Sequence, residues 1–286
     1  MEPENRETGS PRSEKPRRPW IAAALTLLVP GLGQLYGGEL KRALAVYLGY
    51  YCLFIALLVS GLPRTFGGLI VLLLAALLLH VWMIWDAVRI ARRNTAYVLK
   101  PYNRWYLYLV VMAVAFFLSP RVLALSPVRA FQIPSGNMEP AVRVGDHLYA
   151  DMRYYRSAGP ARGDLAVLAS PENSALIIMR VIGLEGERIE IRDKKVYIDS
   201  QPLADPWGRY QAPQNNTFAF EIPELQQRDN FGPLKIPMGS VFVMGDNRDN
   251  SYDSRFIGPV PISSLRGRLL YVYWSPDRSR IGTYLR

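Results

Sequence analysis

Long apolar segments in the first 125 residues constrain the fold of this 286-residue chain more than any other feature. A helix needs about 20 apolar residues to cross a bilayer. Segments 43–60, 66–85 and 105–125 are of about that length. Pro120 interrupts the last of them near its end. We therefore predict an α-helical membrane region over residues 20–125 with about three spans.

A fourth apolar segment, 20–36, is short and is broken by Pro30 and two glycines. Such a segment is predicted to be re-entrant or to lie at the interface rather than to span. The motif PGLGQLYGG at 30–38 resembles a short motif of small multi-span membrane modules, and we interpret it as a glycine-rich turn where two helices approach closely. The polar residues 1–19 are predicted to form a disordered basic tail.

Basic residues flank the apolar segments and contribute to a net charge of +10. Lys and Arg concentrate on the cytoplasmic side of membrane proteins. The connection 87–104 is rich in both, so we predict that it is cytoplasmic, as is the tail, and that residues after about 126 lie outside the cytoplasm. No nucleic-acid-binding motif accompanies the charge, so the predicted partner is the lipid bilayer and not nucleic acid.

Residues 126–286 change to short apolar runs separated by turn residues, which is the pattern of a β domain. Asp193-Lys194 is predicted to begin a hairpin turn. No long amphipathic helix is predicted in this half of the chain. The predicted strands are 146–150 with its flanks, 164–169, 176–184, 188–191, 195–198 and 240–244.

Four blocks in the β half carry a family resemblance. The first is FQIPSGNMEP at 131–140, followed by VGD at 144–146. The second is RGDLAV at 162–167, the third is RVIGLEG at 180–186, and the fourth is MGDNRDNSYDSR at 244–255. In this order they resemble the bacterial type I signal peptidases, the Ser/Lys peptidases of family S26 that cut leader peptides from exported proteins.

The resemblance implies a mostly-β extracytoplasmic domain with the coiled β-sheet fold of that family, preceded by the helical membrane region. It implies a multi-pass protein of the bacterial inner (cytoplasmic) membrane, with signal peptides or preproteins as partners. An additional partner in the secretion machinery stays open. We expect neither a cofactor nor a metal, because no His, Cys or carboxylate cluster has the spacing of a metal site.

Both members of the catalytic dyad of that family are replaced in this chain. By the resemblance, the nucleophilic serine corresponds to Asn137 and the general-base lysine to Met179. A serine is a weak nucleophile until a base removes its proton. An amide is not ionisable, and a thioether accepts no proton usefully at neutral pH. We therefore expect no ordinary Ser/Lys peptidase turnover.

The resemblance also assigns supporting residues. Ser135 would contribute to the oxyanion hole, and Ser251 would orient the general base. Asp253 and Arg255 would form an ion pair below the site. Seven residues would line small apolar subsites for the leader peptide, although by pattern alone they are equally consistent with plain core. They are Phe131, Ile133, Pro134, Met138, Val142, Ile177 and Ile178.

Replacement chemistry from other residues has little support in the sequence. A Ser-His-Asp triad needs a histidine, and His80 lies in a membrane segment while His147 lies on a predicted strand. We predict a signal-peptidase-like membrane protein that lacks ordinary peptidase activity and binds leader-like peptides or a membrane partner. Two alternatives stay open. One is an active signal peptidase I that cleaves preproteins, and the other is a membrane scaffold whose function lies in residues 20–125.

Overall fold

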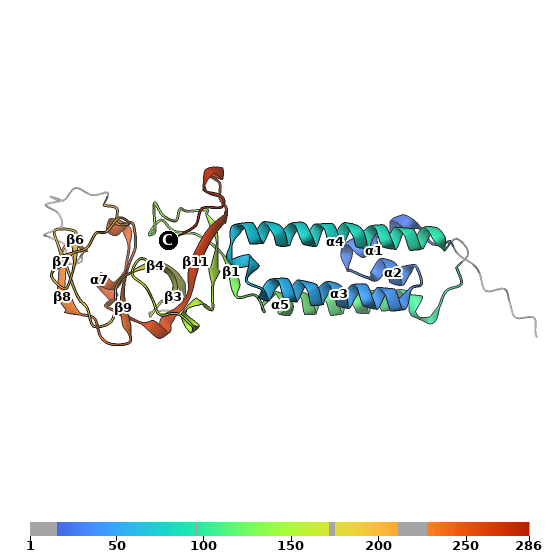
Figure 1. Ribbon diagram of the computed structural model, residues 1–286, viewed down its shortest axis with the longest axis horizontal. Helices are drawn as coiled ribbons and strands as arrows, with labels where there is room; N and C mark the ends of the chain where they lie inside the picture. The colour runs from blue at the N-terminus through green and yellow to red at the C-terminus, as the bar shows by residue number, and fades with distance from the viewer. Residues whose placement is uncertain (1–15, 95–96, 172–174, 211–227, 286) are drawn as a thin grey trace, which may run out of the picture. The chain divides into compact units, whose positions relative to one another are not determined.

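The chain forms two compact units, one helical and one mostly β (Figure 1). The helical unit ends at Ser126, and the β unit begins at Pro127 and includes the short segment Pro63–Phe66. The predicted tail, 1–19, lies mostly outside the described residues. The computed structural model describes residues 16–94, 97–171, 175–210 and 228–285.

Three helices of the described helical unit are long and apolar enough to cross a membrane. They are α3 (Leu40–Val59), α4 (Phe66–Arg93) and α5 (Trp105–Leu123). Each covers one of the segments that the hydropathy pattern predicts to span. The shorter helices are α1 (Pro19–Leu28) and α2 (Leu32–Tyr36), with 3₁₀ turns at Leu62–Arg64 and Pro101–Asn103.

Helix α4 is longer than the sequence pattern predicts. The predicted span ends at residue 85 and the connection 87–104 follows it, whereas the helix continues to Arg93. Ala87 and Ala91 are buried together with Ala22 of α1. Small residues four apart lie on one face of a helix, so packing against α1 keeps these turns helical despite their basic side chains.

Glycines of the motif at 30–38 allow close packing around α2. Gly31 separates α1 from α2 with a φ of 88°, a left-handed conformation that other residues rarely adopt. A Cβ on Gly33 would lie 2.3 Å from the carbonyl oxygen of Ala22 and 2.7 Å from the Cβ of Ala87. The break and the close approach agree with the predicted glycine-rich turn.

A buried acid, Asp86, joins three helices of this unit. Arg42 of α3 donates to both carboxylate oxygens of Asp86, at 2.9 Å from Nε and 2.5 Å from Nη2. Gln34 of α2 donates to the same carboxylate at 3.3 Å. Buried charges persist where they are paired and hydrogen-bonded, so Asp86 has a structural explanation that requires no reaction.

Two antiparallel sheets make up the β unit (Figure 1). The larger has the strand order β1-β2-β11-β3-β4-β9-β10, and the smaller has the order β7-β6-β5-β8. The bounds are β1 Val128–Gln132, β2 His147–Asp151, β3 Leu165–Ala169, β4 Leu176–Gly183, β5 Arg188–Arg192, β6 Lys195–Ile198, β7 Gln201–Pro202, β8 Phe231–Lys235, β9 Ser240–Met244, β10 Val260–Pro261 and β11 Leu265–Trp274, with helix α7 at Ser254–Ile257.

Apolar residues of the central strands form two buried cores. In the larger core, Val181 of β4 and Val243 of β9 are register partners and are fully buried. In the smaller core, Phe242 of β9 packs with Ile189 of β5, so β9 contributes to both. This sharing connects the two sheets through one strand whose side chains are buried on both faces.

The observed fold class is the predicted one, apolar helices followed by a curled and mostly-β domain. Predicted strands 195–198 and 240–244 coincide with β6 and β9. Asp193 and Lys194 have φ values of 46° and 67° in the turn that joins β5 to β6, as the hairpin prediction requires. Strands β1, β8 and β11 and the two-residue strands β7 and β10 are not among the predicted strands.

Candidate active site

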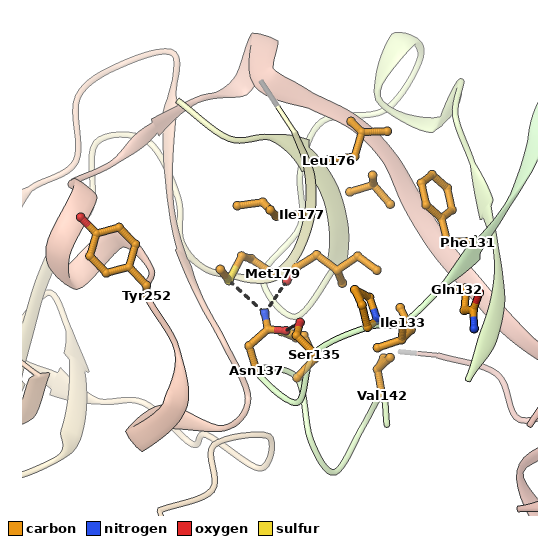
Figure 2. A pocket seen from close by; sticks show the side chains of 14 residues that line it. Phe131, Gln132, Ile133, Ser135, Asn137, Val142, Leu176, Ile177, Met179 and Tyr252 are labelled. Atoms are coloured by element: carbon orange, nitrogen blue, oxygen red, sulfur yellow. Dashed lines mark hydrogen bonds between the residues drawn. The ribbon is translucent and has the colours of Figure 1, made fainter. Parts of the chain in front are cut away.

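A pocket of about 310 Å³ lies in the β unit between the loop that follows β1 and strand β4 (Figure 2). All seven residues assigned to apolar subsites by the resemblance line it, together with Ser135, Asn137 and Met179. The structure thus brings these sequence-predicted residues to one place. Four further lining residues were missed by sequence reasoning, namely Gln132, Val167, Leu176 and Tyr252.

The loop after β1 positions Asn137 at the pocket without regular secondary structure. Its ends are held together, because the Ile133 N–H donates to the Asp146 carbonyl oxygen at 3.0 Å. Met138 and Val142 are only 1% and 0% exposed, so the loop is anchored in the core on both sides of its turn. These two buried apolar side chains explain why the loop adopts a fixed position.

The carboxylate of Asp146 fixes the far end of the same loop. Arg280 donates to it from Nη2 at 2.7 Å, and the backbone N–H of Arg143 donates at 3.0 Å. Burial raises the pKa of Asp146, but these hydrogen bonds outweigh burial and hold the pKa below its ordinary value. The carboxylate is therefore charged at neutral pH and keeps the hydrogen bonds that fix the loop.

Asn137 and Met179 lie side by side (Figure 2). Met179 pairs with Ala166 of β3 and is 4% exposed. The Nδ2 of Asn137 lies 3.9 Å from the Met179 sulfur and donates to the Ile178 carbonyl oxygen at 3.1 Å. The Oγ of Ser135 donates to Oδ1 of Asn137 at 2.8 Å. The two positions that the sequence resemblance assigns to the dyad are therefore neighbours in space.

Ser251 approaches Met179 from the loop after β9, with its Oγ 3.8 Å from the sulfur. Gly245 makes room for this approach, because a Cβ there would lie 2.3 Å from Ser251 Oγ and 2.6 Å from the Asn137 carbonyl oxygen. The Asn247 N–H donates to that same Asn137 oxygen at 3.1 Å. Gly245 and Asn247 belong to the fourth block, but sequence reasoning gave neither a role in the site.

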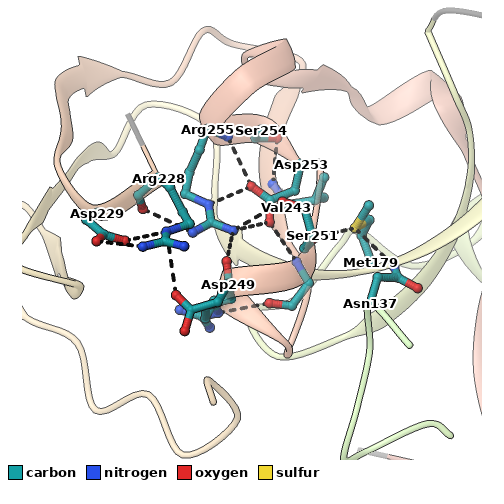
Figure 3. Close-up of polar contacts among 12 residues, drawn as sticks. Asn137, Met179, Arg228, Asp229, Val243, Asp249, Ser251, Asp253, Ser254 and Arg255 are labelled. Carbon is teal, nitrogen blue, oxygen red and sulfur yellow. Dashed lines mark hydrogen bonds and ion pairs between the residues drawn. The ribbon is translucent and has the colours of Figure 1, made fainter. Parts of the chain in front are cut away.

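Asp253 and Arg255 form an ion pair where this loop meets helix α7 (Figure 3). The Arg255 Nε is 2.9 Å from Asp253 Oδ1, and the two side chains are 1% and 0% exposed. Asp253 also accepts from the Gly245 N–H at 3.0 Å, and Arg255 donates to the Arg248 carbonyl oxygen at 2.6 Å. The pair connects both ends of the segment that carries Ser251 and so sets its position.

A second buried ion pair, missed by sequence reasoning, joins β4 to the start of the same loop. Arg180 donates to Asp246 from Nε and Nη2 at 2.7 Å each, and both side chains are 1% exposed. Its Nη1 donates to the Gly163 carbonyl oxygen at 2.6 Å, and the guanidinium lies 5.0 Å from the Trp207 ring. Arg180 belongs to the third block and Asp246 to the fourth, but the sequence does not reveal that they pair, because the pairing depends on the register of β4 against β9.

The described lining residues contain no nucleophile with a base beside it. They include no His, Lys, Asp or Glu. The hydroxyl of Ser135 donates to an amide, and that of Ser251 faces a thioether. An activated nucleophile needs a proton acceptor within hydrogen-bond reach. No group of three or more His, Cys, Asp or Glu in the described ranges could hold a metal ion.

Apolar helices followed by a curled β unit, with a small apolar pocket beside Asn137 and Met179, agree with the signal-peptidase-like architecture that the sequence predicts. The family model for signal peptidase, peptidase S26, matches residues 103–274. The chain belongs to this family.

Known proteins share this similarity over much of their length. A signal peptidase I from Leptolyngbya laminosa is 36% identical over 170 residues, which are 55% of this chain and 76% of that protein. One from Pseudomonas fluorescens is 28% identical over 246 residues, which are 69% and 83% of the two chains. A solved signal peptidase I from Enterococcus faecalis V583 has 30% identity and a TM-score of 0.31, covering 39% of this chain and 97% of its own.

Proposed function

We propose that this chain is a catalytically silent signal peptidase homologue that binds leader-like peptides in the pocket beside Asn137. One observation carries the proposal. An amide and a thioether, Asn137 and Met179, lie together at the two positions that by the resemblance correspond to nucleophile and base, beside an apolar pocket and the buried Asp253–Arg255 ion pair. The relatives are named for cleaving signal peptides, so a peptide of that kind is the ligand expected here.

The edge of strand β4 supports binding of an extended peptide. Among the described strands, β9 pairs with β4 at Arg180, Val181 and Gly183, so Leu176–Met179 pairs only with β3. An extended peptide can add to such an edge through main-chain hydrogen bonds, with pockets for its alternate side chains. The aliphatic lining and the volume of about 310 Å³ favour small apolar side chains in those pockets.

Peptide binding tests the proposal directly. The full chain in detergent is expected to bind a fluorescent, C-terminally amidated leader-type peptide ending in Ala-X-Ala, measured by fluorescence anisotropy. A matched peptide with Trp in place of both alanines is expected to bind at least about tenfold more weakly, because two indoles exceed the pocket. Equal binding of the two peptides, or binding of neither, would rule out this use of the pocket.

We also propose an orientation for the helical unit in the bacterial cytoplasmic membrane. The connection after α4 is basic, which favours the cytoplasm for that end and the extracytoplasmic side for the β unit. Helices α1 and α2 would then enter and leave on the cytoplasmic side. A cysteine placed at residue 10 is expected to resist a membrane-impermeant thiol reagent in intact cells. Labelling of that cysteine before lysis would reverse the orientation.

A further inference from the structure

The side-chain amide of Asn137 makes the two hydrogen bonds of a peptide group. Its oxygen accepts from the Ser135 hydroxyl at 2.8 Å. Its nitrogen donates to the Ile178 carbonyl oxygen at 3.1 Å (Figure 2). A primary carboxamide has the same acceptor and donor chemistry as a backbone amide. Asn137 therefore satisfies one donor and one acceptor in the pocket at the same time.

The acceptor in question belongs to the edge of β4 that would receive a peptide. Ile178 pairs with Val167 of β3 on one side of the strand. Its carbonyl oxygen points to Asn137 and not to β3, as the hydrogen bond requires. A strand added at this edge would donate a backbone N–H to the same oxygen. The side chain of Asn137 and such a strand therefore compete for one acceptor.

We propose that the Asn137 carboxamide is an internal ligand of this pocket, and that it holds the place of one backbone amide of an extended peptide. The inference rests on the proposed peptide-binding function and adds to it how the site is regulated. A bound peptide has to displace the carboxamide from Ile178 and from Ser135. The unaltered chain therefore binds peptide with only the open fraction of its molecules, which weakens the apparent affinity.

A purely structural role for Asn137 predicts the opposite sign. If the carboxamide only ties the loop to β4, its removal loosens the pocket and weakens peptide binding. If it is an internal ligand, its removal strengthens binding. Loss of two hydrogen bonds of ordinary net strength corresponds to an affinity increase of about tenfold. The direction of the change therefore separates the two roles.

The experiment compares the full chain with Asn137→Ala in detergent, using the amidated Ala-X-Ala peptide and fluorescence anisotropy. Asn250→Ala is the matched control, because it makes the same substitution at an exposed asparagine that directly precedes Ser251. We expect about tenfold tighter binding by Asn137→Ala and no change in the control. Asn137→Asp replaces it if Asn137→Ala does not elute as a folded species. A carboxylate cannot donate to the Ile178 carbonyl oxygen, so this variant is also expected to bind the peptide more tightly.

The outcomes distinguish the inference from the function on which it rests. The internal-ligand role would be overturned if the folded variant bound the peptide with the same affinity as the unaltered chain, or more weakly. The peptide-binding function would still stand. Absence of binding by the unaltered chain and by a folded variant would overturn both. Measurable binding by the unaltered chain, tighter binding by Asn137→Ala and unchanged binding by Asn250→Ala support both.

Discussion

The double variant Asn137→Ser/Met179→Lys is expected to cleave a leader-bearing preprotein that the unaltered chain leaves intact. The two side chains already meet, with Asn137 Nδ2 3.9 Å from the Met179 sulfur. A lysine at this 4% exposed position would be desolvated, and desolvation lowers the pKa of an amine so that it can act as a base. Cleavage in detergent, followed by mass spectrometry of the products, should rise by at least about 10³-fold.

The single variants are the controls for this gain. A nucleophile and its base act as a unit, so either one alone is expected to stay at the level of the unaltered chain. Met179→Lys alone is also expected to lower the Tm, because it buries an amine without an acidic partner. Cleavage by the unaltered chain at the rate of the double variant would refute the silent-site proposal. A folded double variant without activity would show that more than two positions have changed.

The length of the apolar segments predicted the long helices of this chain better than it predicted where they end. The spans follow from residue counting, because a bilayer sets their length. The end of α4 does not, since Ala87 and Ala91 are buried against α1 even though Arg89 lies between them and two arginines follow. A basic loop and a basic helix end have similar amino-acid compositions, so only tertiary packing distinguishes the two. Strand β11 was missed for a related reason, because Arg266, Gly267 and Arg268 weaken its apolar pattern.

The candidate site shows the same division between local and tertiary information. The resemblance located Asn137, Met179 and seven further lining residues, because these stand at fixed positions within or close to the four blocks. Hydrogen bonds that depend on three-dimensional placement were beyond it. The contact of Asn137 with Ile178 requires the loop after β1 to lie across the edge of β4. A glycine is likewise needed at position 245 because Ser251 and the Asn137 carbonyl oxygen occupy the space that a Cβ would take.

Replacing Asp246 by Ala is expected to destabilise the β unit more than removal of any exposed charge. Asp246 is the bidentate partner of Arg180, and both side chains are 1% exposed. Removing the carboxylate leaves a buried guanidinium without its counter-charge, which costs about 3–5 kcal/mol. The expected result is a Tm lower by roughly 10 °C. Tryptophan fluorescence of the full chain in detergent can follow it, because Trp207 lies 5.0 Å from Arg180.

Two comparisons make the Asp246 result specific to the loss of its carboxylate. Arg180→Met/Asp246→Val removes both charges and is expected to recover part of the Tm, because a buried ion pair often contributes little over an apolar pair. Recovery stays incomplete, since the Gly163 carbonyl oxygen loses its donor. Arg143→Ala removes an ion pair with Asp277 whose side chains are 50% and 46% exposed, and should leave the Tm unchanged. If Asp246→Ala had the same Tm as Arg143→Ala, the Arg180–Asp246 pair would not be the contact that holds β4 to the loop that carries Ser251.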